Sequence, residues 1–219
     1  GETLSLGIKL ANEINADVVF GTDPDCDRLG VALRNKHNVF VTLTGNQVGI
    51  LLMHYILTRL EEEGNLPANG AVVKSIVTTD MAKVIAKDFR VALFETLVGF
   101  KFIGEKIKEW EKTGDQTFLF GFEESCGYLR GTHARDKDAV VASMLMAELV
   151  CYYADKGTSV FDVLSSLYQK YGTYEDKVIS LAFAGADGKD KMSAFMQKIR
   201  TSRPKELGIR VTAVRDYLA

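Results

Sequence analysis

The spacing of apolar residues along the chain predicts alternating helices and strands. In the first third, apolar side chains recur at helical spacing over two stretches, and three shorter runs have the composition of strands. The predicted order is a helix over 4–14, strands at 18–20, 30–33 and 39–43, and a helix over 47–63. The polar turn between the last two strands favours a hairpin, and Gly64 ends the second helix.

The next hundred residues continue this alternation. Strands are predicted at 71–77, 90–95 and 117–120, and helices at 81–88, 102–112, 138–153 and 160–171. Such alternation is typical of a mainly parallel sheet covered by helices. We therefore expect an α/β fold, a three-layer αβα domain with a mainly parallel mixed sheet, flanked by partial domains. A polar linker, 173–177, would then lead to a strand at 178–183, a helix near 191–200 and a strand near 209–214.

Composition narrows the class of protein. With 219 residues, 47% of them hydrophobic, the chain can bury a sizeable core, and its net charge of −2 argues against nucleic acid or anionic lipid as a partner. Three distant cysteines indicate reduced thiols and a cytoplasmic location. The longest apolar stretch, 139–154, falls short of the roughly 20 residues that cross a bilayer. Because the N-terminus enters a helix almost at once, we expect a fragment of a longer protein.

Three aspartates follow the first predicted strand and form the strongest candidate for chemistry. Asp23, Asp25 and Asp27 alternate along Thr22–Leu29, so an extended backbone would point all three the same way. Clustered carboxylates repel one another unless a cation or an arginine lies beside them, and oxygen ligands suit Mg²⁺. The alternative is a solvated turn with helix-capping aspartates. An EF-hand is excluded, because Arg28 stands where that loop needs glycine.

Two further loops combine glycine with polar side chains. In Gly121–Gly127, which we expect to be a loop, Glu123 and Ser125 offer acceptors suited to sugar hydroxyls, although an acidic surface turn would have the same composition. Gly99 and Lys101 precede a predicted helix, where backbone amides and an ammonium group favour an anion. Lys101 would otherwise be a solvated lysine.

A mixed-charge run precedes the predicted helix at 138–153. Within 133–138 we single out Lys137 as a candidate for contact with an anion, against the default of a solvated capping segment. In open α/β sheets, ligands bind beyond the carboxyl ends of the strands, which is where most of the polar loops fall.

Together these loops resemble the alpha-D-phosphohexomutases, the phosphoglucomutase and phosphomannomutase group. Thr22–Arg28 resembles that family's magnesium loop, Asp-x-Asp-x-Asp-Arg, and Gly121–Gly127 its sugar-recognition loop, Gly-Glu-x-Ser-Gly. Thr96–Lys101 is similar to the segment Thr-x-Thr-Gly-Phe-Lys, and Arg135–Asp138 to the phosphate-proximal Arg-Glu-Lys-Asp. Cys126 stands where some members place histidine near the sugar loop, which is closer to phosphoglucomutase-like members.

The resemblance implies a division into domains. Residues 1–41 would end the metal-binding second domain, 42–172 would form the sugar-recognition third domain, and 173–219 would be a linker and the start of the phosphate-binding fourth. The family's phosphoserine motif, Thr-x-Ser-His-Asn-Pro, belongs to the first domain and does not occur in this sequence. The first domain and most of the fourth would therefore be partners supplied by the parent chain, and the 219 residues alone are predicted to be inactive.

The resemblance also implies a reaction and roles. The parent enzyme would interconvert hexose 1-phosphate and hexose 6-phosphate through a phosphoserine and a hexose 1,6-bisphosphate, with Mg²⁺ as cofactor. The implied metal ligands are Asp23, Asp25 and Asp27, and the implied substrate-binding residues are Arg28, Gly99, Glu123, Ser125 and Lys137. Lys101 and Lys137 would transfer protons or stabilise charge.

Two alternatives remain at the level of sequence. A haloacid-dehalogenase-type phosphatase would use Asp23 as nucleophile and Asp25 as acid/base, but it leaves the loop around Glu123 without a role. A non-catalytic module that binds metal or sugar phosphate would retain affinity without turnover.

Overall fold

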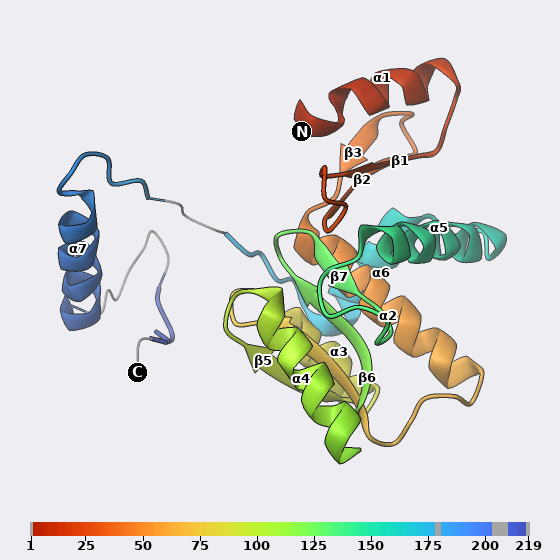
Figure 1. Ribbon diagram of the computed structural model, residues 1–219. Helices are drawn as coiled ribbons and strands as arrows, with labels where there is room; N and C mark the ends of the chain where they lie inside the picture. Colours follow the sequence, from red (N-terminus) through yellow and green to blue (C-terminus); the bar gives the residue numbers. More distant parts are fainter. Residues whose placement is uncertain (1, 178–180, 203–209, 218–219) are drawn as a thin grey trace. The chain divides into compact units, whose positions relative to one another are not determined.

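The computed structural model describes residues 2–177, 181–202 and 210–217. They belong to two compact units, Gly1–Asp176 and Lys177–Ala219. The first unit contains two sheets with their helices (Figure 1). In the described part of the second, the one regular element longer than a single bridge residue is helix α7 (Gly188–Ser202). No helix within the described ranges has both the length and the apolar character needed to cross a membrane.

A small antiparallel sheet opens the first unit. It follows the 3-10 turn η1 (Glu2–Leu4) and the helix α1 (Ser5–Glu13), and its order is β1 (Val18–Thr22), β2 (Leu29–Arg34), β3 (Phe40–Thr42). One face packs on η1 through Leu4 and on α1 through Ala11, and the other buries Leu29 and Val31 in the main core. Gly21 permits the first contact, because a Cβ there would lie 2.4 Å from Leu4 Cδ2.

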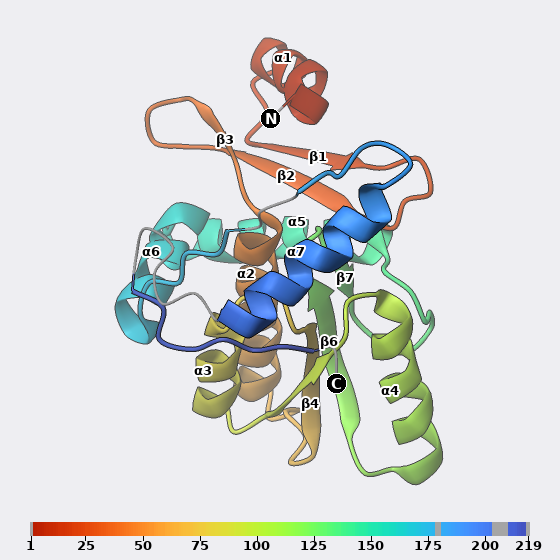
Figure 2. The same cartoon turned by 90° about the vertical axis from the view of Figure 1, so that its left-hand side faces the viewer.

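The larger sheet has the order β5-β4-β6-β7, with the first three strands parallel and β7 antiparallel. Its strands are β4 (Gly70–Ser75), β5 (Ala92–Thr96), β6 (Thr117–Glu123) and β7 (Gly127–Leu129). The helices are α2 (Gly45–Glu62), α3 (Met81–Asp88), α4 (Phe100–Thr113), α5 (Ala139–Asp155) and α6 (Val160–Tyr171). Figure 2 shows α4 on one side of the sheet and α2 and α3 on the other.

Separate cores hold these layers together. On one face Val73 and Phe118 pack against Ile103 and Trp110 of α4, and the core on the other face combines β-strand residues with α2, α3, α5 and α6. Val72 and Val73 point to opposite faces because side chains alternate along a strand. The predicted three-layer αβα domain with a mainly parallel mixed sheet is confirmed.

The starts of the helices follow from local chemistry. Thr44 and Gln47 form a capping box at α2, in which the Thr44 side chain accepts from the Gln47 backbone and the Gln47 side chain accepts from the Thr44 backbone. Asp138 caps α5 by accepting from two backbone N–H groups, and Ser159 caps α6. These caps fix where each helix emerges from the polar loops.

Several predicted boundaries were wrong. Helix α4 begins at Phe100 and not at Phe102, because Gly99, at φ 120°, serves as its N-cap. The predicted loop Gly121–Gly127 is a hairpin: Gly121 lies in β6, Gly127 opens β7, and the turn between the strands is only residues 124–126. The short strand β7 went unpredicted, since Gly-Tyr-Leu is too brief for a periodicity to register.

Two C-terminal strand predictions also fail where they can be checked. For 178–183, residues 178–180 lie outside the described residues, and residues 181–183 have no regular structure. For 209–214, residue 209 lies outside them, Arg210 forms a single bridge, and 211–214 are irregular. The intervening helix prediction is confirmed by α7.

Candidate functional site

The acidic loop brings its three aspartates together through a turn. Asp23, Asp25 and Asp27 each offer one carboxylate oxygen, and these oxygens lie within 4.8 Å of one another. The expected extended backbone is wrong: the Cys26 N–H donates to the Asp23 carbonyl at 3.0 Å, and Cys26 has a left-handed φ of 58°. The turn thus achieves the convergence that an alternating strand was expected to give.

Asp23 organises this turn with its own side chain. Its Oδ1 accepts from the backbone N–H groups of Asp27, at 3.1 Å, and Arg28, at 3.0 Å, and its Oδ2 accepts from Arg28 Nε at 2.8 Å. These contacts, chiefly the Arg28 backbone N–H, lower the pKa of Asp23 to about 2. The same carboxylate raises the pKa of the Arg28 guanidinium.

The donor set of the loop fits a hard divalent cation. Asp27 Oδ1 is buried and accepts no hydrogen bond from the described residues, and Arg28 Nε lies 3.4 Å from it. A buried oxygen of this kind is costly without a partner. Three converging carboxylates, one of them with an unbonded oxygen, match the oxygen coordination of Mg²⁺.

Backbone contacts attach the acidic loop to the β6–β7 hairpin. Arg28 forms an isolated antiparallel bridge with Gly127, and the Leu29 N–H donates to the Cys126 carbonyl at 3.0 Å. The Ala139 N–H, at the start of α5, donates to the Cys26 carbonyl at 3.1 Å. The small sheet therefore presents its acidic loop beside the β6–β7 hairpin, which carries Glu123 and Ser125.

Lys137 connects the two loops. Its Nζ lies 2.8 Å from Asp27 Oδ2 and 3.0 Å from Asp136 Oδ1, and its stem covers Gly127, where a Cβ would lie 2.1 Å from Lys137 Cδ. Burial opposes the charged ammonium, but the two carboxylates outweigh it and raise the pKa of Lys137. Lys137 is therefore suited to stabilising negative charge and poorly suited to accepting a proton.

Glu123 ends β6 and is 5% exposed. Its Oε1 accepts from the Gly99 N–H at 2.8 Å, which joins the hairpin to the N-terminus of α4. Burial raises the pKa of Glu123, and the neighbouring Glu124 adds to that effect against the opposing Gly99 bond. A buried carboxylate at the carboxyl edge of the sheet is placed as a ligand-binding acceptor would be.

The remaining predicted site residues are less constrained. Ser125 is exposed at the tip of the turn. Lys101 is also exposed, and its Nζ lies 4.8 Å from the centre of the Phe102 ring. Among the described residues, no hydrogen bond or ion pair joins either side chain to the rest of the site.

A buried polar cluster at the carboxyl end of β4 was not predicted from the sequence. Its members are Lys74, Ser75 and Thr78, and it contacts the carboxylate of Glu124 in the hairpin turn. The sequence did contain one indication of this cluster. Lys74 and Ser75 directly follow Val72 and Val73 in a strand buried on both faces, where polar residues are unusual.

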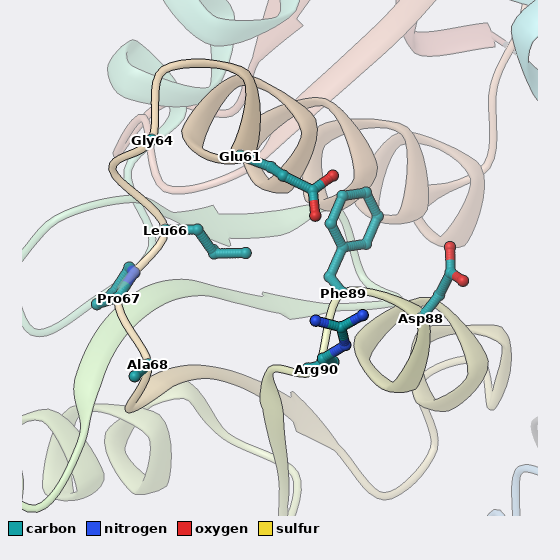
Figure 3. Close-up of a pocket in the computed structure, with 8 residues that line it drawn as sticks. All are labelled: Glu61, Gly64, Leu66, Pro67, Ala68, Asp88, Phe89 and Arg90. Atoms are coloured by element: carbon teal, nitrogen blue, oxygen red, sulfur yellow. The ribbon is translucent and has the colours of Figure 1, made fainter.

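A separate cavity lies at the opposite edge of the sheet (Figure 3). It measures about 510 Å³ and is formed by the end of α2, the segment before β4 and the segment before β5. Glu61, Phe89 and Arg90 line it, and Asp88, which also lines it, bonds Lys170 at 2.7 Å. It shares no lining residue with the candidate site.

Comparison with known families matches the larger part of the chain. Residues 44–171 match the phosphoglucomutase/phosphomannomutase family, alpha/beta/alpha domain III. A phosphoglucomutase from Staphylococcus aureus (strain USA300) is 37% identical over 212 residues, which are 96% of this chain and 37% of that protein. The chain thus spans well under half the length of this relative.

Solved structures share the fold. Parafusin, a phosphoglucomutase from Paramecium in an open form, covers 99% of this chain with a TM-score of 0.60 at 21% identity, and 36% of that protein is matched. An N-acetylphosphoglucosamine mutase from Aspergillus fumigatus, in complex with GlcNAc-6P and magnesium, covers 85% of this chain and 41% of its own, with a TM-score of 0.52 at 15% identity.

Proposed function

The chain belongs to the phosphoglucomutase/phosphomannomutase family, and we propose that its acidic loop and its β6–β7 turn form two sides of one site for a hexose phosphate. The observation that carries the proposal is the contact between them. Lys137 Nζ bonds Asp27 at 2.8 Å while its stem lies against Gly127, and Cys126 accepts from Leu29. A cation-binding cluster and a buried sugar-type acceptor on adjoining loops suit a ligand that carries both phosphate and hydroxyl groups.

Asp23, Asp25 and Asp27 would hold Mg²⁺, which when bound neutralises charge on a phosphoryl group. The buried, unbonded Oδ1 of Asp27 supports this assignment. So does the magnesium named for the Aspergillus fumigatus mutase of the same fold. Arg28, already beside the cluster, would support the phosphate.

Glu123 and Ser125 would accept and donate hydrogen bonds to sugar hydroxyls, with the Gly99 amide fixing the Glu123 carboxylate. Lys137 would stabilise phosphate charge, consistent with its raised pKa. Lys101 would approach a ligand from the first turn of α4, where its exposed ammonium is free to reorient.

For a longer protein containing these residues, we propose interconversion of hexose 1-phosphate and hexose 6-phosphate through a phosphoserine and a hexose 1,6-bisphosphate. Residues 1–41, 42–172 and 173–219 would then belong to its second, third and fourth domains. Because the phosphoserine motif does not occur in the 219 residues, these alone would bind ligand and not turn it over. The cytoplasmic location stays a prediction.

Two measurements on the 219-residue chain test the proposal. Titration calorimetry with glucose 1,6-bisphosphate should show binding that is stronger with Mg²⁺ than with EDTA, and no binding under either condition would contradict the site. A coupled assay should detect no conversion of glucose 1-phosphate to glucose 6-phosphate. Conversion by the purified chain would refute the assignment of the phosphoryl donor to another domain.

A further inference from the structure

We propose that Glu124 is a positioning residue. Its carboxylate accepts hydrogen bonds from the hydroxyl groups of Ser75 and Thr78, and these bonds hold the β6–β7 hairpin that carries Glu123 and Ser125. This inference rests on the proposed role of that turn in binding a sugar phosphate. It assigns different tasks to two neighbouring glutamates of the same hairpin.

The side chain and the backbone N–H of Glu124 are hydrogen-bonded to residues at and just after the end of β4. Its Oε2 accepts from Ser75 Oγ at 3.1 Å and from Thr78 Oγ1 at 3.1 Å. Its backbone N–H donates to Thr78 Oγ1 at 3.2 Å, and the two hydroxyl oxygens lie 2.7 Å apart. Ser75 is 0% exposed and Thr78 is 3% exposed, so this anchor is screened from water.

The segment that holds Glu124 is itself held from within the sheet. Lys74 is fully buried, and its Nζ donates to the carbonyls of Thr78, at 2.8 Å, and Ser75, at 3.3 Å. Glu95, on the neighbouring strand β5, accepts from the same Nζ at 3.0 Å. Lys74 thus folds residues 75–78 back over the end of β4 and orients the Thr78 hydroxyl.

Glu123 and Glu124 consequently reach different partners. The Glu123 side chain meets the Gly99 N–H at the start of α4, and the Glu124 side chain meets the loop after β4. On the far side of the turn, α2 leaves no room for movement, since a Cβ on Gly45 would lie 2.0 Å from the Glu124 carbonyl oxygen. Anchoring Glu124 therefore fixes the backbone on which Glu123 and Ser125 stand.

The geometry separates anchoring from a direct role of the charge. Because one oxygen, Oε2, accepts from both hydroxyls, the amide of glutamine supplies an equivalent acceptor, whereas alanine supplies none. A residue that acted on the ligand through its charge would lose that action in both variants. Glu124→Gln and Glu124→Ala are thus a matched pair.

The test measures amide hydrogen exchange by NMR in the 219-residue chain, without ligand. In Glu124→Ala, exchange of the Gly99 N–H should accelerate roughly ten- to hundredfold, because the loss of the anchor frees Glu123 to leave its bond. Glu124→Gln should stay within about threefold of the parent chain. Thr78→Val, which keeps the side-chain volume and removes the bridging hydroxyl, should reproduce the alanine result. Glu105→Ala, on the exposed surface of α4, should leave the Gly99 rate unchanged.

The proposal would be overturned if the exchange rate of the Gly99 N–H were the same as in the parent chain in either Glu124→Ala or Thr78→Val. A glutamine variant as fast as the alanine variant would also overturn it, since that would assign the effect to charge. Binding of glucose 1,6-bisphosphate, measured in parallel, should weaken in Glu124→Ala and persist in Glu124→Gln. If the parent chain binds none, the proposed function fails, while the exchange rates still decide on the anchor.

Discussion

The two loops that meet at the candidate site are ordered in opposite ways. The turn of the acidic loop is formed by local contacts, since Asp23 bonds the backbone of Asp27 and Arg28 four and five positions on. The β6–β7 turn is ordered by residues far away in sequence: Gly99, 24 positions from Glu123, and Ser75 and Thr78, 49 and 46 positions from Glu124.

The acidic loop therefore gathers negative charge in a solvent-accessible turn, whereas the β6–β7 turn has a backbone held rigid by buried contacts. The Arg28 side chain is 55% exposed, so we expect its contact with the acidic cluster to be readily exchanged for a cation. The turn, in contrast, is held by buried hydrogen bonds that cost free energy when one partner is removed. We expect the first loop to respond to metal and the second to keep its shape.

The largest effect is expected where the turn meets α2. Gly45→Ala places a Cβ 2.0 Å from the Glu124 carbonyl oxygen and 2.8 Å from the Cys126 nitrogen, so backbone must move. The free energy of unfolding, measured with urea, should fall by about 2–3 kcal/mol. Gly64→Ala, with φ 68° but nothing within 4 Å, should cost only about 1 kcal/mol. Equal losses in the two variants would argue that the turn is loosely packed.

Removal of Asp25 should act on metal binding alone. Asp25 is exposed, so Asp25→Ala should leave unfolding unchanged yet weaken Mn²⁺ binding by about tenfold or more, measured by electron paramagnetic resonance. Exposed Asp17, outside the cluster, provides the control variant Asp17→Ala. Undiminished Mn²⁺ binding by Asp25→Ala would show that the cluster is a solvated turn.

Lys137, which touches both loops, should matter more than Lys101. Lys137→Met breaks the bond to Asp27 and should lower the free energy of unfolding by about 0.5–1 kcal/mol, whereas Lys101→Met should change it by less than about 0.5 kcal/mol. Urea denaturation of both variants at low salt compares them directly. The reverse ranking would contradict the bridging position of Lys137.

The smallest effect concerns pH. Because burial raises the pKa of Glu123, the folded chain binds this proton more tightly than the unfolded chain, so its contribution to stability is present at low pH and is lost as pH rises above about 4.5. Glu123→Gln removes that loss. In the presence of EDTA, its stability relative to the parent chain should therefore increase between pH 4 and pH 7, and a constant difference would refute the shift.

The sequence predicted what is local. Helix spacing and the acidic loop depend on residues within about five positions of one another, and most element types were correct, whereas the caps at Thr44 and Asp138 were not predicted. The αβα layering followed from the alternation of strands and helices alone.

What was missed depends on distant partners. The hairpin at Glu123 appeared as a loop because β7 is three residues long and exists by pairing with β6. Glu124 gave no signal of its own, since its partners Ser75 and Thr78 reach it only through the parallel pairing of β4 and β6. The clustering of the three aspartates was predicted, but with an extended backbone in place of the observed turn. The turn was missed because the left-handed φ of Cys26 is not favoured by its residue type.

Chemical-shift mapping with glucose 1,6-bisphosphate and Mg²⁺ tests most directly whether the two loops form one site. We expect that backbone amide resonances of both the acidic loop, residues 23–28, and the β6–β7 turn with its flanking strand ends, residues 123–127, shift on titration, and that EDTA reduces the shifts at the acidic loop most. Shifts confined to one loop, or to the cavity at Glu61 and Arg90, would contradict it.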